Sequence, residues 1–128
     1  MNKKEAKFQV IWDQYLREKQ KTGEMYGYYE LKQTNTESFP FSKIETVQYD
    51  GLQATEKSGL VWKLSDNDMR PKPCDCFSIP PLPSYLVIKF LDGFYMIRFQ
   101  RIVEHRESGR ISITRLEAES LAEKIIKI

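Results

Sequence analysis

The chain has 128 residues, 41% of them hydrophobic and 30% charged, and a net charge of +2. This size predicts one domain over residues 1–128 with a real hydrophobic core, and the composition is typical of a globular protein in water. No apolar run approaches the ~20 residues that a membrane-spanning helix needs, and none follows the charged N-terminus as in a signal peptide. We therefore expect a cytoplasmic protein without membrane contact.

Helix, strand and turn signals alternate in the first half of the chain. The expected elements are a helix over residues 4–20, a strand over 26–32, a polar loop over 33–38, a helix over 42–57 and a strand over 60–64. The second helix is predicted from the capping-box pattern of Ser42 and Glu45, with Gly59 as its C-terminal stop. Strand, helix and strand at this spacing favour a crossover that leaves the two strands parallel.

The second half predicts mostly strands. The expected elements are strands over 74–79, 85–90 and 94–101, a polar turn over 104–110, a short strand over 110–114 and a helix from there to residue 128. Asp92-Gly93 marks a hairpin between two β-prone runs, and Thr114 with Glu117 forms another capping-box pattern. The chain thus predicts an α/β domain with a central mixed sheet flanked by helices.

Glu30 and Lys32 are the first residues that point to chemistry. On a strand they project from the same face, and such a pair is usually an ion pair on a wet surface. Here a helix carrying Gln48 follows, and two further carboxylates stand elsewhere in the chain. Asp75 lies near the start of the strand predicted over residues 74–79, and Glu5 lies on the apolar edge of the first helix, where a helix-dipole role is equally compatible.

The run from residue 28 to residue 64 resembles the core of the PD-(D/E)xK nucleases, and within them the RecU-type Holliday junction resolvases and related phage proteins. The shared features are a Glu-x-Lys strand, a polar loop with Thr, a Phe-Pro turn, a helix with Gln and a Gly-led apolar strand. They correspond to Glu30-Leu31-Lys32, Thr34 and Thr36, Phe39-Pro40-Phe41, Gln48, and Gly59 to Leu64. The resemblance implies a restriction-endonuclease-like fold and a metal-dependent endonuclease that cuts DNA, including branched DNA.

One departure from the family concerns the metal site. The family carries a metal-binding Asp on the strand before the Glu-x-Lys strand, and residues 22–29 contain no Asp. Asp75 is the best substitute, which implies a permuted or migrated site. The resemblance then implies that Glu30 and Asp75 hold Mg²⁺ or Mn²⁺, with Glu5 at a second ion or a metal-bound water.

The remaining roles follow from the same resemblance. Lys32 would orient or deprotonate the attacking water, and Gln48 would hydrogen-bond a metal-binding carboxylate or the phosphate. Contacts to DNA phosphates are assigned to Thr34, Thr36, Lys43 and Lys72. A homodimer is compatible with a resolvase. Two other functions stay open: an inactive nucleic-acid-binding module of the same fold, and a phage or mobile-element accessory protein that acts through protein contacts of the basic 98–110 segment.

Overall fold

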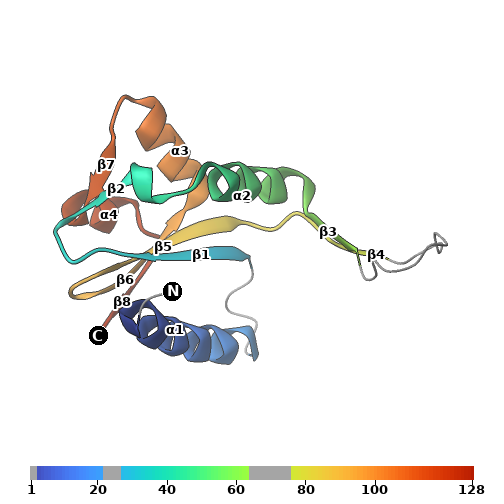
Figure 1. The fold of residues 1–128 in the computed structure, drawn as a ribbon, viewed down its shortest axis with the longest axis horizontal. Helices are drawn as coiled ribbons and strands as arrows, with labels where there is room; N and C mark the ends of the chain where they lie inside the picture. Colours follow the sequence, from blue (N-terminus) through green and yellow to red (C-terminus); the bar gives the residue numbers. More distant parts are fainter. Residues whose placement is uncertain (1–2, 22–26, 64–75) are drawn as a thin grey trace.

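The protein is a single α/β domain built on a mixed four-stranded sheet (Figure 1). The computed structural model describes residues 3–21, 27–63 and 76–128. The strands of the sheet are β1 (Tyr28–Gln33), β5 (Ser84–Phe90), β6 (Gly93–Arg98) and β8 (Lys124–Lys127), in that spatial order. β1 pairs with β5 in parallel, whereas the β5–β6 and β6–β8 pairs are antiparallel. The expected central mixed sheet is therefore confirmed.

Helices cover both faces of this sheet. α1 (Lys3–Lys21) lies on one face, where Trp12 packs with Val87 and Phe94. α2 (Thr46–Ser58), α3 (Phe99–Glu107) and α4 (Arg115–Leu121) cover the other face and pack on Leu86 and Ile88 (Figure 1). Successive side chains of a strand point to opposite faces, so every residue of β5 is buried between these two layers.

Two short strand pairs complete the fold. β2 (Ser38–Pro40) pairs with β7 (Ser112–Thr114), and the 3₁₀ helix η1 (Phe41–Lys43) follows β2 directly. β3 (Leu60–Lys63) and β4 (Cys76–Ile79) form a separate antiparallel pair, the β3–β4 arm, which projects from the body of the domain (Figure 1). No helix in the described ranges is both long and apolar enough to cross a membrane.

The prediction that the strand after the second helix pairs in parallel with the Glu-x-Lys strand is wrong. The strand that follows α2 in the sequence is β3, but within residues 3–21, 27–63 and 76–128 it pairs only with β4, and β1 pairs in parallel with β5. β5 suits this position because its seven residues are all buried, as a strand covered on both faces requires. The crossover from β1 to its parallel partner thus contains the β3–β4 arm as well as α2.

The second helix begins later than predicted. Ser42 lies in η1, and Ile44 has an extended backbone, which allows Phe41 and Ile44 both to be buried in the core. The capping box of α2 is formed by Glu45 and Gln48 instead of Ser42 and Glu45. The predicted stop is confirmed, because the N–H of Gly59 donates to the carbonyl oxygen of Thr55 (2.9 Å).

Two predictions near the C-terminus are also wrong. Residues 99–107 form the helix α3 and are neither the end of a strand nor a polar turn, since Phe99 and Ile102, three residues apart, are both buried on one helix face. The chain after α4 forms the strand β8 and does not continue as a helix. Ile125 and Ile126 pack on opposite faces of the sheet, which a strand achieves and a helix does not.

The second capping box is present as predicted, and it yields a stability test. Thr114 Oγ1 accepts from the N–H of Glu117 (3.1 Å), and Glu117 Oε1 accepts from the N–H of Thr114 (3.0 Å). Replacing Thr114→Ala should lower the free energy of unfolding by about 1 kcal/mol, measured by urea denaturation. Ser120→Ala, at an exposed position of the same helix, should change it far less, and equal losses in the two variants would contradict the capping role.

Candidate functional site

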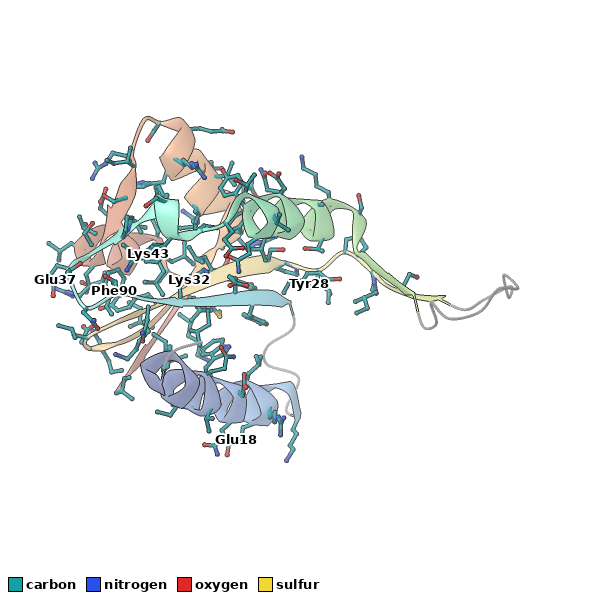
Figure 2. The ribbon with its side chains drawn as sticks, in the orientation of Figure 1. Glu18, Tyr28, Lys32, Glu37, Lys43 and Phe90 are labelled. Carbon is teal, nitrogen blue, oxygen red and sulfur yellow. The ribbon has the colours of Figure 1, made fainter. Side chains whose placement is uncertain are left out.

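Glu30 and Lys32 lie side by side on β1, as the two-residue spacing predicted. Their neighbours on β5 are Leu86 and Ile88, so both side chains are on the face covered by α2. Lys32 Nζ is 3.6 Å from Glu30 Oε1, and the two side chains are 19% and 28% exposed. Figure 2 shows Lys32 on this strand between the sheet and the α2 layer. The pair is partly shielded from water but remains accessible.

Gln48 connects this ion pair to α2. Its Nε2 donates to Glu30 Oε1 (2.9 Å), which is one of the two contacts proposed from the sequence. Its Oε1 accepts from the backbone N–H of Glu45 (3.3 Å) as part of the capping box. Because both ends of the carboxamide are held, the start of α2 fixes the orientation of the Glu30 carboxylate.

The middle and the C-terminal end of α2 are tied to the sheet by one further contact each. Ser84 Oγ donates to the carbonyl oxygen of Leu52 (2.7 Å), and Arg98 forms an ion pair with Glu56 (2.6 Å). A helix anchored at both ends keeps its side chains in place, which favours a preformed arrangement around Glu30.

A cavity of about 590 Å³ lies beside Glu30. Its back wall is β1, one of the two edge strands of the four-stranded sheet in the described structure. Its sides are one face of α1 and one face of α2, each contributing residues at spacing i, i+3, i+4 and i+7. These are Gln9, Trp12, Asp13 and Leu16 from α1, and Gln48, Gly51, Leu52 and Thr55 from α2. We call this cavity the β1 slot.

Asp13 is a slot residue that the sequence did not single out. Its Oδ1 accepts from Nε2 of Gln9 (2.9 Å), one helical turn away. The available signal was its place directly after Trp12, on the border of the buried stripe of α1.

Burial raises the pKa of Tyr29, another slot residue, to about 12, so this phenol stays protonated and neutral near pH 7.

The threonines assigned to phosphate contacts close the loop after β1. The hydroxyls of Thr34 and Thr36 both donate to the carbonyl oxygen of Ser38 (3.0 and 2.7 Å), and Thr34 is buried. In this arrangement their protons hold the loop, so their role in phosphate binding stays a prediction. Lys43, at the end of η1, is exposed and lies on the same side of the sheet as Lys32 (Figure 2).

Other predicted site residues are only partly described. Glu5 lies in α1, but its side chain is outside the described part of the structure, and Asp75 and Lys72 lie outside the described residues altogether. Among the described side chains, no three His, Cys, Asp or Glu groups stand close enough to hold one ion. The structure therefore brings Glu30, Lys32 and Gln48 together and leaves the pairing of Glu30 with Asp75 untested.

The sequence was compared with protein-family models and with curated proteins. Neither the protein-family models nor the curated proteins contain a match to this chain.

The contact between Gln48 and Glu30 predicts a pH-dependent loss of stability in Gln48→Glu. The carboxylate introduced at position 48 would face Glu30 in place of a hydrogen-bond donor. Because the two negative charges repel each other, the pKa of the introduced carboxyl group would be higher in the folded than in the unfolded state. The variant should lose about 1–2 kcal/mol of unfolding free energy at pH 7, and the loss should disappear below about pH 4. Gln14→Glu, on the exposed side of α1, is the control, and a similar effect there would contradict the contact.

Proposed function

We propose that this protein is a metal-dependent endonuclease that hydrolyses phosphodiester bonds in DNA. The observation that carries the proposal is the arrangement of Glu30, whose Oε1 receives a hydrogen bond from Gln48 (2.9 Å) and has Lys32 Nζ at 3.6 Å. A carboxylate oriented by a carboxamide and accompanied by an ammonium group, at the wall of an open slot, is suited to an ion and a phosphate. The proposed fold is restriction-endonuclease-like, with a migrated Asp.

The donor chemistry around Glu30 fits Mg²⁺ or Mn²⁺. The hydrogen bond from Gln48 and the ion pair with Lys32 both involve Oε1 of Glu30. Mg²⁺ binds proteins through one or two carboxylates and completes its shell with water and substrate oxygens. We assign Glu30 and Asp75 as these carboxylates and Glu5 to a second ion. When bound, the ion would supply a water of lowered pKa and polarise the scissile phosphate.

The chain's own side chains then have defined tasks. The oxygen of a water molecule forms a new bond to phosphorus and gives up a proton to the solvent. The bond from phosphorus to the sugar oxygen breaks, and this oxygen takes the bonding electron pair and is protonated by water to a hydroxyl group. The Lys32 ammonium group offsets the negative charge that develops on the phosphate and orients the water. Gln48 keeps the Glu30 carboxylate in one orientation, so the order of the site depends on the helix that carries this side chain.

The proposed substrate is DNA with a branch, such as a four-way junction. Lys43 is exposed on the α2 side of the sheet, where it would contact a backbone phosphate, and Lys72 is assigned to the same task. Contacts of this kind position a duplex without reading its sequence. A homodimer would allow the two strands of a junction to be cut symmetrically.

Cleavage assays provide the direct test. With Mg²⁺ or Mn²⁺, the protein should nick supercoiled plasmid and cut a four-way junction, and Glu30→Gln, Asp75→Asn and Lys32→Ala should each lower the rate about 100-fold or more. Each variant should still bind the junction in a gel-shift assay. Lys57→Ala, at an exposed position of α2, should cut at the normal rate.

The outcomes separate the alternatives. DNA binding without cleavage under any of these conditions, unchanged by Glu30→Gln, would identify an inactive binding module. Absence of DNA binding would favour an accessory protein that acts through protein contacts. Cleavage that survives Lys32→Ala and Asp75→Asn would place the chemistry elsewhere in the chain.

Lys43 provides a separate test of the DNA surface. Lys43→Ala should weaken junction binding and reduce the slope of log affinity against log salt by about 0.9, because one phosphate contact is lost. The measurement is a fluorescence-anisotropy titration at several salt concentrations. An unchanged slope would exclude Lys43 from the phosphate contacts, and Lys57→Ala again serves as the control.

A further inference from the structure

The β1 slot has the shape of a site for one more strand. Among the described residues β1 pairs only with β5, along one edge, so the backbone groups along its other edge face the slot. Unpaired N–H and C=O groups of an edge strand are a template for another strand. Because α1 and α2 extend past this edge and form the two sides of the slot, an added strand would be covered on both faces, as β5 is.

The β3–β4 arm is the complementary feature. Its two strands are four residues long each, and in the described chain they pair only with each other. An isolated two-stranded pair is at best marginally stable in water, whereas addition to a larger sheet stabilises it. The arm projects away from the domain (Figure 1), so it presents its outer backbone edges to other molecules.

The base of the arm lies where β1 begins. Tyr28 Oη donates to the carbonyl oxygen of Pro80 (3.0 Å), and the Tyr28 N–H donates to that of Pro83 (2.9 Å). Together with Pro81, these prolines restrict the backbone of the connection to β5 and make it a stiff, extended spacer. The spacer directs the arm away from the slot of its own chain.

This placement fits a reciprocal exchange between two copies. Arm and slot start at the same end of β1, so a two-fold axis near this end would bring each arm to the slot of the other copy. Such an interface uses the same surfaces on both chains and closes at a dimer. We propose that two copies of this chain exchange their β3–β4 arms, each arm adding as strands to the open edge of β1 in the partner, between α1 and α2.

The exchange would place a segment of the second copy next to Glu30. A site of this kind is complete only in the dimer, which deepens the proposed function by naming a second copy of the chain as the partner at that site. Assembly and chemistry can be measured separately, since crosslinking reports the exchanged arm and DNA cleavage reports the site. A crosslinked dimer without cleavage would overturn the proposed function and leave the exchange standing.

Crosslinking tests which chain supplies the arm. In a background with Cys74→Ser and Cys76→Ser, which removes both cysteines of the chain, chains carrying Gly51→Cys are co-expressed with differently tagged chains carrying Ser78→Cys. Gly51 lines the slot and a Cβ there meets nothing within 4 Å, while Ser78 is an exposed residue of β4. A short bismaleimide should join the two differently tagged chains. Ala54→Cys, on the exposed side of α2, should give no such product.

A blocked slot provides the second measurement. Gly51→Trp should fill the slot and raise the dimer dissociation constant about tenfold or more in sedimentation velocity, whereas Ala54→Trp should not. Circular dichroism melts of both variants should show that the fold is retained. A wild-type chain that stays monomeric, a dimer that Gly51→Trp does not weaken, or a crosslink formed only within a chain carrying both Gly51→Cys and Ser78→Cys would overturn the proposal.

Discussion

The parallel pairing of β1 with β5 is the constraint on which the rest of the structure depends. Two parallel strands cannot be joined by a tight turn, so the chain must return from the end of β1 to the start of β5 through a long connection. That connection contains α2, which covers one face of the sheet, and the β3–β4 arm, which leaves the sheet altogether. Among the described residues β1 has no second neighbour and is an edge strand, so the position of Glu30 beside an open slot follows from the strand order.

The extent of burial explains why β5 carries mainly apolar side chains whereas β1 also carries polar ones. β5 contributes apolar side chains to both sides, and α1 on one side and α2 to α4 on the other need apolar surfaces to match. The residues of β1 are only half-buried, and in the described part of the chain its outer edge has no neighbour in the sheet. Polar side chains are therefore tolerated on β1. Glu30 and Lys32 keep access to water and form an ion pair with each other, and Glu30 also accepts a hydrogen bond from Gln48.

Much of this arrangement could be predicted from the sequence because it depends on local spacing. Period-two alternation placed Glu30 and Lys32 on one face, and the capping pattern of Thr114 and Glu117 located α4. Long-range pairing could not be predicted in the same way, because the sequences of β3 and β5 both favour strands and neither contains a local signal that it pairs with β1. The prediction of a helix up to residue 128 was wrong for a related reason. The spacing of Leu121, Ile125 and Ile128 fits a helical period, although the chain there forms the strand β8. The slot depends on three separate elements, so Asp13 had no local motif to mark it.

The double role of Gln48 has a thermodynamic consequence. The same carboxamide caps the first turn of α2 and holds the Glu30 carboxylate, so local opening of that turn and loss of order at Glu30 are one event. By linkage, any ligand that binds only the ordered carboxylate must also stabilise the helix terminus. Amide hydrogen exchange in the first turn of α2 would then slow on ligand binding, although no ligand atom touches those amides. The end of a helix would in this way act as a reporter of occupancy at a neighbouring strand.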